Sequence, residues 1–410
     1  MVSSINIFKF VLVLKTLIMT REEIGNKTIE LAKEHNNLLL TFATGVGKSL
    51  ASLKVINRLT TDKFYIIVKE TNHITNWELE IQKHGLQDLL LRCEILCYDS
   101  LHKLTEKGNF ILDECHAITP KRLELLKPLV LKRVIALSAT IPYTKSKLLS
   151  KLANFYEYHI STSEAISWGI LPNPIIYVHN TILDDTNKYL TYIKIKGNNK
   201  IRILKSCEFR ERFKFLKQYK NLELHIKCTE VEYYNLLTED LNYWKKLYFK
   251  IRKQFAKQKF LLLGIRRKRF VASCKTKLAE SIIKSFHSNY RYIVFTNSIE
   301  QCEKLGNNII HSKVKNKSKI IEDFQNKKTN SLFAVNMLKE SMNFNDINSG
   351  LLIQVDSEEL TFIQTLGRIL RSVTPEFHLI ITKDTMDEKY FSNVINNLEN
   401  VNLKIIDYNK

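Results

Sequence analysis

Paired metal-binding cysteines are missing from this sequence. Its seven cysteines are scattered and odd in number, none forms a Cys-x-x-Cys pair, and no histidine cluster accompanies them. This pattern is typical of buried thiols in a reducing compartment, and it argues against disulfides or a zinc site. We therefore expect a cytoplasmic chain that is not secreted.

A convincing membrane span or signal peptide is missing as well. The apolar stretch from Ile5 to Met19 is interrupted by Lys9 and Lys15, no basic residue precedes it, and no small-residue cleavage site follows it. It is too short and too charged for a confident span. We treat residues 1–18 as an N-terminal extension without an assigned role, and we expect no membrane contact.

Acidic residues are few relative to basic ones, 42 against 63, which gives a formal net charge of +21. Such an excess favours a polyanionic partner, with nucleic acid first and an acidic membrane surface second. The alternative is a generally basic proteome rich in Lys, Asn and Ile. From Lys245 to Lys277 there are thirteen Lys or Arg and no Asp or Glu, with aromatic residues interleaved. Because uncompensated charges repel one another unless an anion screens them, we favour nucleic-acid contact over a solvated basic helix.

The chain is too long for one compact core, and it shows no short repeat and no low-complexity tract. Short apolar runs alternate with amphipathic stretches in two series, which is typical of parallel sheets covered on both faces. We predict a first α/β domain at 19–160 and a second at 161–410, with a basic, mainly helical insertion at about 182–280. The strands are predicted at 38–40, 64–68, 93–97, 110–112, 133–137, 174–178, 291–295, 332–335, 351–355 and 377–381. Helices are predicted at 21–35 and 77–84.

A glycine-bearing loop follows the apolar run Leu38–Leu40 and precedes a stretch with helical spacing. A strand, a glycine turn that ends in Gly-Lys-Ser, and a following helix form the context of a phosphate-binding loop. Lys48 would reach the β and γ phosphates, and the Ser49 hydroxyl would bind Mg²⁺. A glycine turn without a ligand is the plainer interpretation, which the Gly-Lys-Ser ending disfavours. The predicted ATP-binding residues of the loop are Thr44, Gly45, Val46, Gly47, Lys48 and Ser49.

An acidic pair, Asp113 and Glu114, follows the predicted strand 110–112. The carboxyl ends of parallel strands are where such sheets bind ligands. Asp113 would hold the Mg²⁺, and Glu114 would orient and deprotonate the attacking water. Ser138 and Thr140, at the end of the next predicted strand, are placed to hydrogen-bond the carboxylate loop and relay the state of the phosphate.

Two arginines in the second half, Arg368 and Arg371, are three residues apart and share one helical face, with Gln364 on the neighbouring turn. Two arginines on one face are suited to stabilise charge on a transferred phosphoryl group. A basic surface helix is the simpler alternative.

Taken together, these segments resemble the motifs of superfamily 2 helicases of the Asp-Glu-x-His type, over most of residues 21–385. The matching segments, in order, are Thr44–Ser49, Val68–Thr71, Asp113–His116, Ser138–Thr140, Phe295–Ser298, Met337–Asn343 and Gln364–Arg371. The stretches Arg266–Phe270 and Ile310–Lys313 look most like small phage-type helicases of DNA repair and recombination. For a viral chain the compartment would be the host cytoplasm.

The resemblance implies two tandem RecA-like domains with ATP between them. Arg368 and Arg371 would then act as arginine fingers, and His116 and Gln364 would couple ATP to the nucleic-acid track. Asn343 stands where Asp is common, and it would hydrogen-bond a ribose hydroxyl. The residues expected to contact nucleic acid are Lys69, Thr71, Thr296, Asn297, Arg266, Arg267, Lys268 and Arg269.

The sequence therefore predicts an ATP-dependent DNA helicase that uses ATP and Mg²⁺ and prefers DNA to RNA. Three alternatives stay open at this point. They are a duplex DNA translocase that does not separate strands, an RNA helicase, and a non-catalytic nucleic-acid-binding module.

Overall fold

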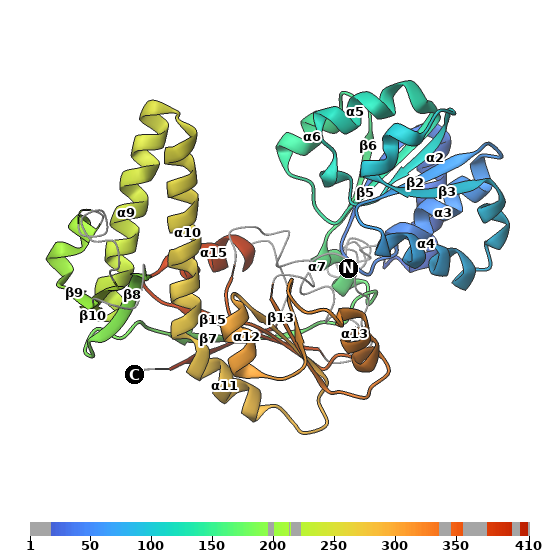
Figure 1. Cartoon of the computed structure of the whole chain (residues 1–410). Coiled ribbons are helices and arrows are strands. Elements are labelled where there is room, and N and C mark those ends of the chain that lie inside the picture. The colour runs from blue at the N-terminus through green and yellow to red at the C-terminus, as the bar shows by residue number, and fades with distance from the viewer. Residues whose placement is uncertain are drawn as a thin grey trace, which may run out of the picture.

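The computed structural model describes residues 18–195, 201–212, 214, 223–335, 346–355, 375–395 and 402–408. Within these residues the chain forms two lobes built on parallel sheets, and a pair of long helices stands away from the second lobe (Figure 1). The two parallel-sheet domains confirm the predicted α/β fold class. Across the described ranges, no helix combines the length and the apolar character that a membrane crossing requires.

The first lobe contains a six-stranded sheet in the order β3-β2-β4-β5-β1-β6, and every adjacent pair is parallel. Its strands are β1 (Asn37–Phe42), β2 (Phe64–Val68), β3 (Cys93–Cys97), β4 (Gly108–Leu112), β5 (Val130–Ser138) and β6 (Tyr156–Ile160). The five strands predicted here correspond to β1 to β5, and the edge strand β6 was not predicted. Strands β2 and β4 are buried along their whole length, as expected for parallel strands with helices on both faces.

The helices of this lobe are α2 (Arg21–Glu34), α3 (Lys48–Leu59), α4 (Asn72–Lys83), α5 (Pro120–Leu126), α6 (Tyr143–Leu149) and α7 (Thr162–Ser167). Short 3₁₀ turns lie at Gln87–Arg92, Tyr98–Lys103, Cys115–Ala117 and Lys127–Leu129. The helix predicted at 21–35 is α2, which begins at a capping box formed by Thr20 and Glu23. The helix predicted at 77–84 is the later part of α4.

The second lobe contains a seven-stranded sheet in the order β12-β13-β11-β14-β15-β7-β16, again with parallel neighbours. Its strands are β7 (Ile175–Thr181), β11 (Tyr292–Thr296), β12 (Ile309–Ile310), β13 (Ser331–Val335), β14 (Ser349–Leu352), β15 (Glu376–Thr382) and β16 (Asn402–Asp407). Its helices are α11 (Thr276–Ser285), α12 (Ile299–Leu305), α13 (Lys317–Gln325) and α15 (Met386–Ile395). All five predicted strands are present, and the edge strands β12 and β16 were not predicted.

Between β7 and α11 the chain forms a small sheet and two long helices. The sheet has the order β8-β10-β9 and consists of β8 (Tyr189–Ile195), β9 (Ile201–Leu204) and β10 (Glu223–Cys228). A 3₁₀ turn at Ser206–Glu211 follows β9 in the chain. The helices α9 (Glu230–Ile251) and α10 (Gln254–Cys274) pack together as a hairpin, which we call the α9–α10 arm (Figure 1). The arm agrees with the predicted helical character, whereas the three-stranded sheet was not predicted.

The base of the α9–α10 arm is joined to the second sheet by buried polar contacts. Lys275, directly after α10, is 1% exposed and forms an ion pair of 2.5 Å with Asp387 at the start of α15. Gln301 of α12 donates to the carbonyl oxygen of Ala272, at 2.6 Å, and accepts from the backbone N–H of Asn297. The arm is therefore fixed to the same loops that follow the central strands of the second lobe.

Candidate functional site

The three predicted motif segments of the first lobe lie at one edge of its sheet. Strands β4, β5 and β1 are neighbours, and all are parallel. Asp113 follows β4, Ser138 is the last residue of β5 and Thr44 lies in the loop after β1, and the ends of parallel strands meet at the carboxyl edge. The strand pairing therefore brings together residues that are 25 to 94 positions apart in sequence.

The loop after β1 requires glycine at two positions. Gly45 has φ +90° and Gly47 has φ +112°, in the left-handed region that side-chain-bearing residues rarely adopt. Gly47 is the N-cap of α3, and no side chain satisfies the first N–H groups of this twelve-residue helix. These free N–H groups, together with the helix dipole, make the loop suited to bind an anion.

Lys48 is the first residue of α3, and its side chain turns back over the loop. Its Nζ donates to the carbonyl oxygen of Phe42 at 2.9 Å. Burial lowers the pKa of the Lys48 ammonium, while the charges of Glu114 and Asp113 oppose that shift. The ammonium thus lies within electrostatic reach of both carboxylates.

Arg21 supports the glycine loop from α2, a role that the sequence analysis did not detect. Its Nη2 donates to the carbonyl oxygens of Gly45, at 3.3 Å, and Ile170, at 2.9 Å. A Cβ added at Gly45 would lie 3.1 Å from Leu171. The loop is therefore held between α2 and the segment after α7. Sequence spacing carries no signal for contacts between such distant residues.

Both carboxylate oxygens of Asp113 accept hydrogen bonds. Oδ2 accepts from the indole Nε1 of Trp77 at 2.9 Å, and Oδ1 accepts from the backbone N–H of Glu114 at 3.0 Å. The Tyr98 hydroxyl donates to the main-chain carbonyl of Asp113 at 3.1 Å. Burial and then the neighbouring Glu114 charge raise the pKa of Asp113, and the Trp77 hydrogen bond opposes this.

Glu114 has a different environment from its neighbour. Its backbone is left-handed, with φ +46°, and its carboxylate is 17% exposed. Oε2 lies 3.2 Å from Nδ1 of His116 in an orientation short of a regular hydrogen bond, and this buried oxygen has no other partner among the described residues. Burial acts to raise the pKa of Glu114, but His116 and the Lys48 charge outweigh it and the pKa is lowered. Glu114 is therefore an ionised carboxylate with an unused accepting oxygen, as a base acting on water requires.

His116 joins the carboxylate loop to the end of β5. The Ser138 hydroxyl donates to the carbonyl oxygen of Thr140 at 2.5 Å. Because that proton is engaged, Ser138 Oγ must accept from Nδ1 of His116, which is 3.2 Å away. Ser138 therefore makes the predicted contact with the carboxylate loop, whereas Thr140 contributes its carbonyl oxygen to Ser138, and the relay of the phosphate state stays a prediction.

The site fits a metal that is shared with phosphate. Among the described residues, no group of three or more His, Cys, Asp or Glu side chains is arranged to hold a metal ion. Mg²⁺ is typically held by one or two carboxylates together with substrate phosphates and water. Asp113, directly after β4, and Ser49, in the first turn of α3, supply such a partial ligand set.

The predicted nucleic-acid contacts in the two lobes differ in exposure. Lys69 is partly buried after β2, and Thr71 is exposed at the start of α4. Thr296 and Asn297 are 4% and 9% exposed, and the Thr296 hydroxyl donates to the carbonyl oxygen of Ala334 at 3.3 Å. The Thr296 and Asn297 side chains therefore offer little surface for contact with a nucleic-acid strand.

The four predicted basic residues of the insertion all lie on α10. Arg267 donates to the Thr238 hydroxyl at 3.1 Å, and Arg266 lies 5.9 Å from the centroid of the Tyr233 ring. Lys268 is partly buried, and Arg269 is exposed. The first two are thus engaged with α9, while Arg269 faces solvent.

Four predicted site residues, Asn343, Gln364, Arg368 and Arg371, lie outside the described residues. Their roles stay predictions.

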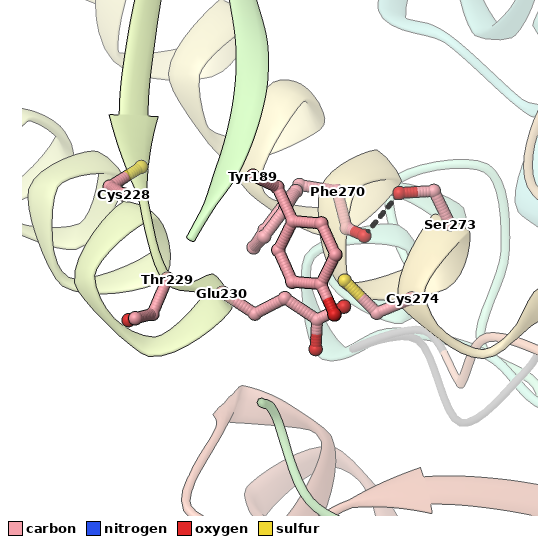
Figure 2. A pocket seen from close by; sticks show the side chains of 7 residues that line it. All are labelled: Tyr189, Cys228, Thr229, Glu230, Phe270, Ser273 and Cys274. Atoms are coloured by element: carbon pink, nitrogen blue, oxygen red, sulfur yellow. Dashed lines mark hydrogen bonds between the residues drawn. The ribbon is translucent and has the colours of Figure 1, made fainter. Parts of the chain in front are cut away.

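A separate cavity of about 170 Å³ lies where the small sheet meets the α9–α10 arm (Figure 2). Its lining residues are Tyr189, Cys228, Thr229, Glu230, Phe270, Ser273 and Cys274. Glu230 already accepts from the backbone N–H of Asp184 at 2.7 Å, and Ser273 donates to the carbonyl of Phe270 at 2.7 Å. Since its polar groups are engaged locally, this cavity does not compete with the loops of the first lobe as a catalytic site.

Two family models match the chain. The model "Type III restriction enzyme, res subunit" matches residues 14–96, and the model "Helicase conserved C-terminal domain" matches residues 274–373. One curated relative, the DNA 3'-5' translocase XPB2 of Sulfurisphaera tokodaii, is 23% identical over 373 residues, which cover 85% of this chain and 78% of the relative.

Solved structures share the fold at low sequence identity. Dbp5 of S. cerevisiae, bound to RNA and ADP BeF3, has a TM-score of 0.56 and 11% identity, with coverage of 94% of this chain and 89% of that one. The ATP-dependent Type ISP restriction-modification enzyme LlaBIII, bound to DNA, has a TM-score of 0.54 and 12% identity, with coverage of 97% of this chain and 32% of that one.

Proposed function

The chain has the tandem core of the superfamily 2 helicases, and from this premise we propose that it is an ATP-dependent motor that moves along DNA and unwinds it. The observation that carries the proposal is the meeting of Lys48, Asp113 and Glu114 at one sheet edge, beside a glycine loop that opens a helix. This arrangement binds a nucleoside triphosphate and activates water against it.

In this proposal, the residues of the first lobe have separate roles in hydrolysis. The free N–H groups at the start of α3 and the Lys48 ammonium bind the phosphates. Ser49 and Asp113 hold Mg²⁺, which when bound neutralises charge on the β and γ phosphates. Glu114 takes the proton of the attacking water on its unused oxygen. Arg368 and Arg371 complete the site from the second lobe, and Asn343 contacts the ribose.

The α9–α10 arm binds nucleic acid in this proposal. The acidic residues Glu239 and Asp240 of α9 pair with Arg210 and Arg212 at the base of the arm. From Leu241 to Ala279 the chain contains no Asp or Glu. The far half of the arm therefore carries positive charge that no carboxylate of its own compensates, which fits a polyphosphate backbone.

Exposed apolar side chains accompany these charges on the arm. Phe249 and Phe255, near the turn between the helices, are 52% and 50% exposed, and Tyr243 is 60% exposed. Arg252, in the turn, lies 5.1 Å from the centroid of the Phe249 ring. Rings beside guanidinium groups are suited to stack on bases at single strands or duplex ends.

DNA is favoured over RNA because the curated relative is a DNA translocase. RNA stays the second candidate, since the structurally similar yeast protein Dbp5 is bound to RNA. The likeness to small phage-type helicases and the cytoplasmic location stay predictions.

The function is tested by measuring ATP hydrolysis with single-stranded DNA, duplex DNA, forked DNA and RNA in parallel. We expect stimulation by DNA, and strand displacement on the fork. Stimulation by RNA alone would reassign the substrate. Displacement of a bound third strand without separation of the fork would identify a duplex translocase. A full absence of hydrolysis with every polymer would favour a non-catalytic binding module.

The arm is tested by reversing exposed charges on it. The variant Lys250→Glu/Lys253→Glu/Lys257→Glu removes three phosphate contacts, and the matched control Lys107→Glu/Lys132→Glu/Lys151→Glu makes the same charge change on exposed lysines of the first lobe. The slope of log K against log salt should lose about 2 to 3 in the arm variant, since each phosphate contributes about 0.7 to 0.9. Equal slopes in the two variants would show that the arm makes no phosphate contact.

A further inference from the structure

Helix α4 delivers two aromatic side chains to the carboxylate loop of the first lobe. The helix begins directly after Thr71, and its inward face carries His73 and Trp77, which are 5% and 3% exposed. These residues are four apart and therefore lie on adjacent turns of one face. Trp77 is the one that reaches Asp113, with 2.9 Å between Nε1 and Oδ2.

The hydrogen bond from Trp77 constrains Asp113 in a specific way. The other oxygen, Oδ1, is held by the N–H of Glu114, and the backbone carbonyl is held by the Tyr98 hydroxyl. The carboxylate is thus fixed in orientation by neutral donors. An indole N–H donates but carries no charge, so it orients the carboxylate without neutralising it. An arginine or lysine at this place would compete with a cation for the same negative charge.

Each oxygen of Asp113 also keeps accepting capacity, because a carboxylate oxygen has more than one lone pair and each accepts one hydrogen bond here. A carboxylate that is oriented, charged and not saturated is what a divalent cation requires. Groups that hydrogen-bond a metal ligand from outside the coordination sphere typically change metal affinity by 10- to 100-fold.

We propose that Trp77 is a positioning residue for Asp113, and that its indole N–H sets the affinity of the site for Mg²⁺. This inference rests on the proposed role of Asp113 in holding Mg²⁺, and it adds a residue outside the predicted motifs. A purely structural role for Trp77, as a large buried ring in the core of the first lobe, is the alternative.

The test compares two conservative variants, each of which removes one hydrogen-bond donor to Asp113. Trp77→Phe keeps an aromatic ring and removes the N–H to the Asp113 carboxylate. Tyr98→Phe keeps the ring and removes the O–H to the Asp113 backbone carbonyl. We expect Trp77→Phe to raise the Mg²⁺ concentration for half-maximal ATP hydrolysis about tenfold, with the maximal rate recovered at high Mg²⁺. Tyr98→Phe should change that concentration by less than about twofold. An unchanged Mg²⁺ requirement in folded Trp77→Phe would overturn the proposal.

A readout without turnover keeps the test independent of the motor function. The chain has three tryptophans, so Trp168→Phe/Trp244→Phe leaves Trp77 as the single indole emitter. Its emission should change on titration with Mg²⁺ and ADP, and Asp113→Asn should abolish the Mg²⁺-dependent part. Emission that does not change with Mg²⁺ would refute the positioning role. This outcome can be read even if Trp77→Phe fails to fold, because the titration keeps Trp77. Failure of the motor proposal alone would leave this titration intact.

Discussion

Each α/β lobe holds a lysine beside carboxylates near the carboxyl ends of its central strands. The first set consists of Lys48, Asp113 and Glu114, and the second of Lys275 and Asp387. The two sets differ in how many of their hydrogen-bonding groups have partners. Burial lowers the pKa of both Lys48 and Lys275. Lys275 donates to the carbonyl oxygens of Ile353 and Ile380, and its partner Asp387 lies at 2.5 Å. Lys48 donates to one carbonyl oxygen within the described part of the chain.

The carboxylates show the same contrast. Asp387 accepts from the side chain of Gln354 and from the backbone N–H of Thr382, in addition to its ion pair. Within the described ranges, Glu114 keeps a buried oxygen without a hydrogen-bond partner. A saturated buried pair stabilises a fold, whereas unused donors and acceptors mark a place that a ligand completes. This contrast supports the proposal that the first set is catalytic, and it indicates a structural role for the second.

The largest effect should follow from a change at Glu114. Glu114→Gln keeps the shape of the side chain and removes its ability to take a proton. We expect kcat for ATP hydrolysis to fall by about 10²- to 10⁴-fold with ATP binding retained, since this is the range for a general base. Steady-state hydrolysis and nucleotide binding are measured on the same preparation. A variant with more than a tenth of the normal kcat would contradict the catalytic assignment.

At the structural pair, Lys275→Met should act on stability. Removing one partner leaves the Asp387 charge buried, which costs about 3 to 5 kcal/mol in the free energy of unfolding. Denaturant unfolding measures the loss. The double variant Lys275→Met/Asp387→Leu should recover most of it, because no unpaired charge remains. Equal stability in the single and double variants would break the comparison.

The stability of the second lobe should also depend on pH. His179 of β7 lies with Nε2 2.9 Å from Nδ1 of His378, and burial and then this neighbour lower the pKa of His179 to about 4. Between pH 6.5 and 4 the unfolded chain binds a proton at this position that the folded chain does not. Stability should therefore fall as pH decreases through this window, by at most about 3 kcal/mol. Unfolding measured at pH 7 and pH 4.5 should differ less in His179→Gln, and an undiminished difference would exclude His179 as the source.

The smallest of the effects concerns coupling through His116. His116→Phe removes the hydrogen bond to Ser138 and also the ion-pair partner of Glu114. We therefore compare each variant with its own basal rate, and we expect the stimulation by nucleic acid to fall by about tenfold, since one buried hydrogen bond contributes about 1 to 1.5 kcal/mol. Rates with and without saturating DNA provide the measurement. Full stimulation in the variant would show that His116 carries no coupling.

The sequence predicted the central elements well because they are dictated locally. Apolar strands and a Gly-Lys-Ser loop leave little choice, so β1 to β5 and the placement of Lys48 and Asp113 agree with the prediction. The edge strands β6, β12 and β16 escaped detection since partial exposure weakens their apolar pattern. Arg21, Trp77 and Lys275 were missed for another reason. Their partners lie from 24 to 149 residues away, and only the folded sheet brings them together.

The most direct measurement of the central claim is ATP hydrolysis by the full chain and by Lys48→Ala at saturating DNA, with DNA affinity measured alongside. The account predicts that hydrolysis falls by about 10²-fold or more while DNA affinity and the midpoint of thermal unfolding stay near normal, because it assigns Lys48 to the phosphates of the nucleotide and not to DNA. Normal hydrolysis by Lys48→Ala would contradict the account.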